Sequence, residues 1–371
     1  MCLYPKLIKN RKYIANKKNK GVIPKVTDPR VLYVPVKCGK CMECMKANSR
    51  EWKIRLQEEI RTDKTGQFVT LSFSDESLLS LGEGIELEGY NLDNEIARKA
   101  VRRFLERWRK KFKKSVKHWL ITELGQTNTE RLHIHGLLFT GESTETIEKI
   151  WKYGNVWIGQ YVNERTINYI VKYLYKQDGK HKFYKPKKFC TAGIGKGYTE
   201  RRDSQNNKFR EGETNECYRF RNGGRSALPV YYRNKIYTED ERERLWLEKL
   251  DKQERWVDGA RIDISNGEEA YYNRLELARD KNKRLGFGDD KIDWDRKKYE
   301  QRRRYLLKKD RIAKNLGINA GSTPKSVDYI TLYDYFINGH LPDSLKITTE
   351  TTRALLIDEI KNAILAVELK R

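Results

Sequence analysis

The sequence predicts an α+β protein with a central antiparallel sheet flanked by helices, a basic cysteine-bearing arm before it and a mainly helical extension after it. Between residues 51 and 177, segments of strand-like alternation and of helical periodicity follow one another in the order β-α-β-β-α-β-α. Two of the strand segments, residues 117–123 and 131–139, are separated by only seven residues. This spacing favours an antiparallel hairpin at the centre of a sandwich.

Charge and length limit the class of protein. The 371 residues carry 77 Lys and Arg against 52 Asp and Glu, a formal net charge of +25. Such an excess attracts a polyanion and makes its binding sensitive to salt, so we expect a nucleic acid as partner. A soluble protein with charged helices and a ribosomal-type or structural binder remain alternatives on charge alone. No apolar run reaches the roughly 20 residues that cross a bilayer, so we expect a cytoplasmic protein without a membrane partner.

Residues 1–50 are expected to form a basic, irregular arm that is interrupted by prolines. The arm ends in a C-x2-C-x2-C run formed by Cys38, Cys41 and Cys44. This tight spacing is typical of a zinc knuckle, but a structural zinc site needs four ligands. Cys2 is the expected fourth ligand, with Cys190 and Cys217 as alternatives. Reduced thiols without a metal are the competing interpretation.

Residues 51–200 are expected to form the sandwich domain. Residues 49–61 predict a first helix, and residues 67–73, which alternate with β-branched and aromatic side chains, predict a strand. A loop rich in Gly and Glu follows at residues 82–89. Asp93 is the expected N-cap of a long basic helix that ends near residue 114.

After the predicted hairpin, three further elements complete the sandwich. Residues 144–152 predict a short helix, residues 155–158 a strand, and residues 163–177 a second helix. The last of these segments contains the tyrosines discussed below.

Residues 201–371 are expected to form a basic, mainly helical accessory region. Residues 219–237 interleave Arg and Lys with Phe and Tyr, a composition that can neutralise phosphates and stack bases. Thr238 and Glu241 predict a capping box for a helix that reaches residue 250. Residues 290–316, dense in Lys and Arg, predict another long helix.

A pair of histidines on one predicted strand indicates a metal site. His133 and His135 alternate, so they share one face of the strand and can converge on one ion. Metal-assisted cleavage needs a cation held by imidazole or carboxylate groups with coordination positions left open. Glu123 is the expected third ligand, because it ends the strand that pairs with the histidine strand. An orienting or structural carboxylate is the alternative, and His118, at the far end of that strand, is a weaker choice.

A pair of tyrosines follows on a predicted helix. Tyr169, Lys172, Tyr173 and Lys176 lie within one arc about 100° wide, while the opposite arc is apolar, so we expect the phenols to face away from the core. Tyrosine suits a cleavage that must be reversed, because an aryl phosphodiester keeps the energy of the broken bond. The two tyrosines could alternate, and the two lysines could neutralise the phosphate. Ordinary surface lysines are the alternative, and Tyr175 is expected to pack in the interior.

These motifs resemble those of rolling-circle replication initiators of the HUH superfamily that use two tyrosines. The resemblance is carried by residues 68–75, by the pair His133 and His135, and by the spacing Tyr169-x-x-x-Tyr173-x-x-Lys176. A narrower resemblance is to initiators of the Microviridae, the gokushovirus-like single-stranded DNA phages. It rests on the cysteine run, on a few residues around positions 49, 122 and 227, and spans roughly residues 38–237. One departure is that leucine follows arginine ahead of the histidines, where proline is common.

The resemblance implies an HUH endonuclease sandwich that nicks single-stranded or origin DNA. It implies a metal-dependent, site-specific endonuclease and strand transferase that forms a 5′-phosphotyrosyl intermediate and rejoins strands. The implied catalytic residues are Tyr169, Tyr173, Lys172 and Lys176. The implied ion is Mg²⁺ or Mn²⁺, held by His133, His135 and Glu123. The implied partners are origin DNA and the host replication polymerase and helicase, in the cytoplasm of a bacterial host.

Three alternatives remain at the level of sequence. A single-strand transposase or a relaxase would share the fold, although relaxases usually bring three histidines and a nucleophile near the N-terminus. A non-enzymatic zinc-arm nucleic-acid-binding protein would use its tyrosines only to stack bases. The glycine-rich residues 193–197 lack the preceding strand and the Lys-Ser/Thr pair of a nucleotide-phosphate loop, so no nucleotide cofactor is expected.

Overall fold

A computed structural model of the chain describes residues 2–125, 130–159, 161–175, 181 and 184–287. All of them lie in the first of the two units into which the chain divides, Met1–Arg304. The helix predicted at residues 290–316 lies outside the described residues.

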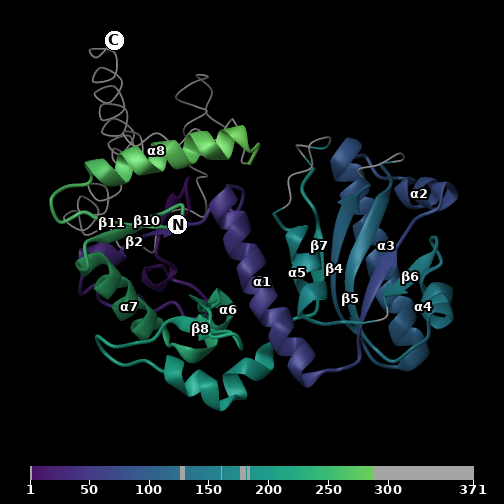
Figure 1. Cartoon of the computed structure of the whole chain (residues 1–371), viewed down its shortest axis with the longest axis horizontal. Helices are drawn as coiled ribbons and strands as arrows, with labels where there is room; N and C mark the ends of the chain where they lie inside the picture. Colours follow the sequence, from purple (N-terminus) through teal and green to yellow (C-terminus); the bar gives the residue numbers. More distant parts are fainter. Residues whose placement is uncertain (1, 126–129, 160, 176–180, 182–183, 288–371) are drawn as a thin grey trace, which may run out of the picture. The chain divides into compact units, whose positions relative to one another are not determined.

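A five-stranded antiparallel sheet organises the central part of the fold (Figure 1). The strand order is β6-β3-β5-β4-β7, and every neighbouring pair is antiparallel. The strands are β3 (Gly66–Leu71), β4 (Lys117–Leu124), β5 (Leu132–Phe139), β6 (Val156–Gly159) and β7 (Lys188–Cys190). The predicted hairpin is confirmed, because β4 and β5 pair along their whole length. The sequence did not predict β7, which has only three residues and no alternation long enough to recognise.

Helices cover both faces of this sheet, which confirms the predicted α+β class. On one face lie α2 (Asp75–Gly82), α3 (Gly89–Phe112) and α4 (Thr144–Trp151). Their apolar side chains form one core with the sheet residues Leu120, Ile134 and Leu138. On the other face, α1 (Met42–Thr62) and α5 (Glu164–Lys172) form a second core with Trp119, Ile121 and Leu137. Burial on both faces supplies the hydrophobic stabilisation of the sandwich.

Two helices on the first face differ from the sequence prediction. Helix α3 begins at Gly89, so Asp93 lies inside the helix and does not cap it. Burial raises the pKa of the Asp93 carboxyl, as expected for an acidic group that has left the helix terminus and water. Helix α2 was not predicted, and the Ser74 side chain caps it by accepting a hydrogen bond from the N–H of Ser77.

Helix α1 begins at Met42, seven residues before the predicted start, so the end of the cysteine run is helical and the arm is not irregular throughout. The backbone N–H of Met42 donates a hydrogen bond of 2.8 Å to Oδ1 of Asn282, a residue distant in sequence. Such a partner satisfies one of the N–H groups that a helix N-terminus leaves open. Tertiary contact therefore extends this helix beyond its sequence signal.

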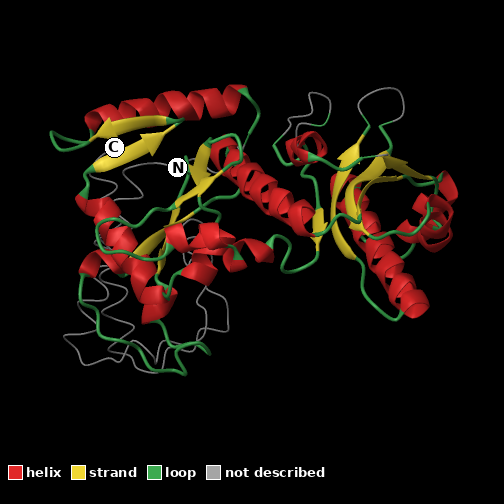
Figure 2. Cartoon of the chain, turned by 60° about the horizontal axis from the view of Figure 1, so that its bottom comes forward, coloured by secondary structure: helices red, strands yellow, loops and turns green. Residues whose placement is uncertain are grey.

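Smaller elements precede and follow the sandwich (Figure 2). The arm contains β1 (Lys6–Lys9) paired with β2 (Tyr33–Val36), and two 3₁₀ turns, η1 (Arg11–Tyr13) and η2 (Pro29–Val31). After β7 come η3 (Lys196–Glu200), η4 (Arg202–Asn207), the hairpin of β8 (Cys217–Arg219) and β9 (Arg225–Ala227), α6 (Val230–Ile236), α7 (Glu239–Asp251), the hairpin of β10 (Glu254–Val257) and β11 (Ala260–Asp263), and α8 (Glu269–Arg284). The predicted capping box of Thr238 and Glu241 is confirmed at the start of α7. Within the described ranges, every helix is too short or too polar to span a membrane.

Candidate active site and cysteine cluster

The register of the sheet brings four polar and aromatic side chains into adjacent positions on one face. Glu123 on β4 lies opposite His133 on β5, and His135 lies opposite Thr70 on β3. Thr70 in turn lies opposite Trp157 on β6. Cross-strand partners share a face, so these side chains point to the side of the sheet that α1 and α5 cover.

His135 is held by a partner at each ring nitrogen. Its Nδ1 lies 3.0 Å from Oγ1 of Thr70, and its Nε2 lies 2.8 Å from Oε2 of Glu123. Two such contacts fix the orientation of the imidazole ring. Glu123 therefore lies beside the histidine pair, as its position at the end of the paired strand suggested.

His133 lies next to this pair and is kept uncharged. Its ring centroid is 6.2 Å from that of His135. Burial, and then the neighbouring His135, lower the pKa of His133 below its ordinary value. A neutral imidazole is the form that binds a metal ion. His118 is different, because it lies on the opposite face with Nδ1 3.0 Å from the carbonyl oxygen of Val116.

The chemistry of the donor set fits a divalent ion better than its present geometry does. Two imidazoles and one carboxylate share one face, and the Glu123 carboxylate is a ligand type that Mg²⁺ and Mn²⁺ prefer. The contact between His135 and Glu123 uses atoms that would bind an ion. Among the described residues, only the cysteine cluster brings three or more potential ligand atoms close together. Metal binding by His133, His135 and Glu123 would therefore require these side chains to turn toward one point.

Helix α5 carries the first tyrosine and ends just before the second. Asn163 opens the helix with a capping box, and the helix ends at Lys172. The N–H of Tyr173 donates to the carbonyl of Ile170 at 3.2 Å, a bond to the third residue back that tightens the final turn. The predicted helix to residue 177 is therefore too long over the described part, and residues 176 and 177 lie outside that part.

The two tyrosines differ in exposure, although their hydroxyls touch. Tyr169 is 46% exposed, whereas Tyr173 is 5% exposed. The Tyr173 ring stacks on His135, with centroids 5.2 Å apart and planes 6° from parallel, and its hydroxyl donates a 2.7 Å hydrogen bond to Oη of Tyr169. The expectation that both phenols face away from the core is therefore wrong for Tyr173. The imidazole on the sheet provides a planar surface that buries this ring.

Burial also changes the acidity of Tyr173. Desolvation, the hydrogen bond with Tyr169 and the nearby Glu123 carboxylate raise the pKa of Tyr173 above its ordinary value. Tyr169 has a cation beside it, because Nζ of Lys172 lies 4.7 Å from the centroid of its ring. Lys176 lies outside the described residues. Tyr175, which was expected to pack in the interior, is exposed.

Sequence reasoning missed three neighbours of this site: Thr70, Phe68 and Trp157. Phe68 contacts both Tyr169 and Trp157 edge to face, with centroids 6.0 and 5.7 Å apart. Alternation along β3 places Phe68 and Thr70 on one face. Only the pairing of β3 with both β5 and β6 brings that face next to the histidines and Trp157.

The cysteine cluster is a second candidate metal site, at the N-terminus of α1. The four ligand atoms of Cys2, Cys38, Cys41 and Cys44 all lie within 4.8 Å of one another. Backbone N–H groups point at these sulfurs: that of Leu3 lies 3.4 Å from Sγ of Cys41, and that of Cys38 lies 3.2 Å from Sγ of Cys2. Such donors stabilise thiolates. The cluster can hold a metal ion and is compatible with structural zinc.

The expected fourth ligand of the cysteine site is therefore Cys2, and the two alternatives are wrong. Cys190 lies in β7 opposite Trp119, and Cys217 lies in β8. The pKa of Cys41 is lowered to about 7, chiefly through its contact with Cys2. A lowered pKa favours the thiolate that a metal requires.

The part of the chain that carries the candidate active site is similar to known replication proteins. Residues 66–178 match the family model described as replication-associated protein ORF2. The match begins at β3 and includes Glu123, both histidines and both tyrosines of the cluster. None of the curated proteins and none of the solved structures compared with the chain matches it. The family match supports a role in the initiation of DNA replication for this part of the chain.

Proposed function

We propose that the protein is a rolling-circle replication initiator of the HUH type, a metal-dependent endonuclease and strand transferase acting on single-stranded and origin DNA. One observation carries the proposal: an exposed phenol, Tyr169, accepts a hydrogen bond from Tyr173, whose ring stacks on His135, which contacts Glu123. The cluster thus joins a nucleophile to groups that bind cations. It lies wholly within the segment that resembles replication-associated proteins.

Tyr169 is the first nucleophile in this proposal. Its hydroxyl is reachable by a DNA strand, whereas Tyr173 is buried and its raised pKa disfavours the phenolate. Oη of Tyr169 attacks the scissile phosphorus and loses its proton, while the bond to the 3′-oxygen breaks and that oxygen takes up a proton. The product is a 5′-phosphotyrosyl link and a free 3′-hydroxyl. The reverse attack by a 3′-hydroxyl rejoins a strand without an external energy source.

Three groups around Tyr169 support this attack. The Tyr173 hydroxyl donates to Oη of Tyr169 and stabilises the negative charge that develops there. The Lys172 ammonium, close to the Tyr169 ring, can neutralise the phosphate. A divalent ion bound by His133, His135 and Glu123 would polarise a phosphate oxygen as a Lewis acid. The Thr70 hydroxyl keeps the His135 ring oriented for that contact.

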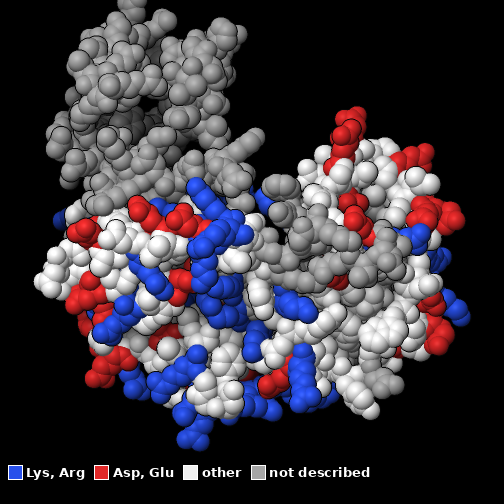
Figure 3. All heavy atoms as spheres, turned by 45° about the horizontal axis from the view of Figure 1, so that its top comes forward, with Lys and Arg blue, Asp and Glu red and all other residues white. Residues whose placement is uncertain are grey.

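The surface near Tyr169 suits an unpaired strand. Trp157 is 58% exposed and Tyr161 is exposed as well, so aromatic faces are available for stacking bases. Figure 3 shows Lys and Arg side chains gathered across the middle and lower part of one molecular face. Together with the net charge of +25, these features support DNA as the partner.

The finer parts of the proposal rest on the sequence resemblance. They are the relationship to initiators of the Microviridae, the action of host polymerase and helicase on the nicked strand, and a purely structural zinc ion in the arm. A single-strand transposase with the same chemistry would differ in its target, so an origin-specific nicking assay separates the two activities.

The proposal is tested by covalent capture of DNA. The full chain is incubated with labelled single-stranded origin DNA and Mn²⁺, boiled in detergent and separated by electrophoresis. We expect a labelled adduct that is lost in the presence of a chelator, in His135→Ala and in the double variant Tyr169→Phe and Tyr173→Phe. Tyr175→Phe, which changes an exposed tyrosine outside the cluster, is the matched control and keeps the adduct. An adduct that survives the double substitution would overturn the assignment.

A non-enzymatic nucleic-acid-binding protein is the second candidate function. Two observations favour it: Tyr173 is buried, and the contact between His135 and Glu123 is complete without an ion. This candidate predicts that the wild-type chain binds the same DNA but forms no adduct, and that the double phenylalanine variant binds equally well.

A further inference from the structure

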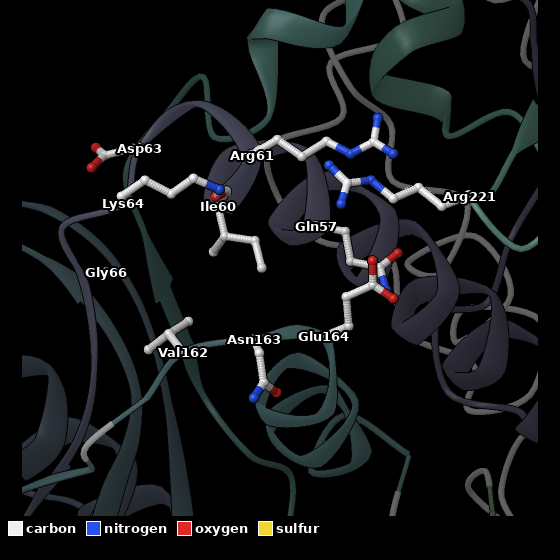
Figure 4. A pocket seen from close by; sticks show the side chains of 10 residues that line it. All are labelled: Gln57, Ile60, Arg61, Asp63, Lys64, Gly66, Val162, Asn163, Glu164 and Arg221. Carbon is white, nitrogen blue, oxygen red and sulfur yellow. Dashed lines mark hydrogen bonds between the residues drawn. The ribbon is translucent and has the colours of Figure 1, made fainter.

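Two adjoining cavities lie away from the tyrosines, between α1, the N-terminus of α5 and the β8–β9 hairpin. Their volumes are about 220 and 330 Å³, and both are lined by Gln57, Arg61, Glu164 and Arg221. Figure 4 shows the side chains that surround the first cavity. Because the lining is shared, the two cavities form one continuous groove, which we call the α1–α5 groove.

Cationic side chains dominate the lining of the α1–α5 groove: Lys53, Arg61, Lys64, Arg221 and Arg225. Figure 4 shows the guanidinium groups of Arg61 and Arg221 reaching toward the same end of the cavity. Arg61 pairs with Glu58 at 3.1 Å, whereas within the described part of the chain no carboxylate lies within 4.0 Å of Arg221 or Arg225. Like charges that gather without counterions favour the binding of an anion.

Two carboxylates also line the groove, and neither cancels this charge. Asp63 already forms an ion pair with Lys117, at 2.9 Å. Glu164 occupies the first turn of α5, where the helix dipole stabilises a negative charge. The groove therefore combines free cations with one acceptor, the Glu164 carboxylate.

Gln57 is a buried amide that faces the groove without a partner. It is only 6% exposed, yet within the described residues its side chain makes no hydrogen bond, and it lines both cavities. Leaving a largely buried amide unsatisfied is costly, so a bound group that pairs with it would be favoured. A carboxamide offers both donors and an acceptor, the combination that pairs with the edge of a nucleobase.

An aromatic ring completes the chemistry. Phe220 lines the larger cavity, and Nζ of Lys53 lies 5.5 Å from its centroid. A ring beside cations is the arrangement that binds unpaired nucleotides, because the base stacks and the phosphate is neutralised. Tyr232, which belongs to the same basic and aromatic segment of the sequence, is fully buried and cannot play this part.

We propose that the α1–α5 groove binds a segment of single-stranded DNA separate from the nucleotide at the tyrosines. Arg61 and Arg221 hold a backbone phosphate, Gln57 pairs with a base edge, and Phe220 stacks on a base. Glu164 precedes Tyr169 by five residues, about 8 Å along the helix axis, so one strand can reach both places. The inference rests on the proposed function only in taking DNA as the substrate.

The test measures binding without cleavage. Fluorescence anisotropy follows a labelled single-stranded oligonucleotide added to the full chain in a chelating buffer. We expect Arg221→Ala to weaken binding about tenfold and to lower the slope of log affinity against log salt by about 0.7, as for one lost phosphate contact. The matched control is Arg219→Ala, which removes the same charge from an exposed position of the same hairpin outside the groove. Equal effects of the two substitutions would overturn the proposal.

Gln57→Leu separates a binding role from a structural one. Replacing an unpartnered amide by an apolar side chain of similar size is expected to keep or raise the unfolding temperature while weakening the oligonucleotide several-fold. Unchanged binding, or weaker binding with a lower unfolding temperature, would contradict the role in base recognition. The outcome is independent of cleavage: a wild-type chain that forms no covalent adduct refutes the proposed function, whereas loss of the contrast between Arg221 and Arg219 refutes the groove.

Discussion

The difference in exposure between the two tyrosines predicts the order in which they act. Tyr169→Phe should abolish the first covalent adduct, because it removes the only exposed hydroxyl of the touching pair. Tyr173→Phe should slow the formation of that adduct without abolishing it. The phenylalanine keeps the ring that stacks on His135, so no cavity forms, and only the hydroxyl is lost.

The size of the Tyr173→Phe effect follows from its 2.7 Å hydrogen bond to Tyr169. In the ground state both groups are neutral, and the loss costs about 1 kcal/mol of folding stability. As Tyr169 attacks, its oxygen carries developing charge, and a bond to a charged group contributes about 1.5 to 3 kcal/mol. We therefore expect adduct formation to slow by roughly 10- to 100-fold.

Peptide mapping identifies the tyrosine that reacts. Lys172 lies between the two tyrosines, so trypsin releases Tyr169 in residues 166–172 and Tyr173 in a separate peptide. Adducts are trapped at early times with single-stranded DNA and Mn²⁺, digested and analysed by mass spectrometry, and their rates are measured by quenched electrophoresis. An early adduct on the peptide that contains Tyr173, or an adduct formed at the wild-type rate by Tyr169→Phe, would refute the assigned order.

Three further predictions concern other parts of the structure. Cys38→Ser should remove about one equivalent of bound zinc, measured by metal analysis, and lower the unfolding temperature, whereas Cys217→Ser, outside the cluster, should change neither. Trp157→Ala should weaken the binding of a single-stranded oligonucleotide by about 1 to 3 kcal/mol, while Trp256→Ala, which removes a similarly exposed tryptophan from the β10–β11 hairpin, should leave affinity unchanged; equal losses would argue against stacking beside Tyr169. Burial lowers the pKa of His118, so the unfolded chain takes up more protons below the ordinary histidine pKa, and stability should fall as the pH drops through about 6.5. Urea unfolding at pH 7.5 and 5.5 should show a smaller fall for His118→Gln than for the wild type, and identical falls would contradict this assignment.

Much of the sandwich was readable from local patterns. The β4–β5 hairpin, α4 and the start of α5 lie within a few residues of the predicted bounds, because their apolar periodicity and capping residues act over short distances. The capping box before α7 is equally local. Helix α2 and strand β7 were missed, since one is short and capped by a single serine and the other has only three residues.

The candidate site divides along the same line. Alternation on β5 alone was enough to place His133 and His135 on one face, and strand pairing made Glu123 their neighbour. The cysteine spacing likewise indicated a cluster, and Cys2 is its fourth member.

The sequence by itself thus determined the elements, the face that each residue occupies and the residue types of the site, because these depend on spacing along one segment. Only the tertiary structure decided that Thr70 orients His135, and that Tyr173 is buried on the His135 ring while Tyr169 stays exposed. It also decided that Gln57 faces a basic groove. These outcomes depend on the order of strands in the sheet and on which helices cover it, and residues far apart in the chain set both.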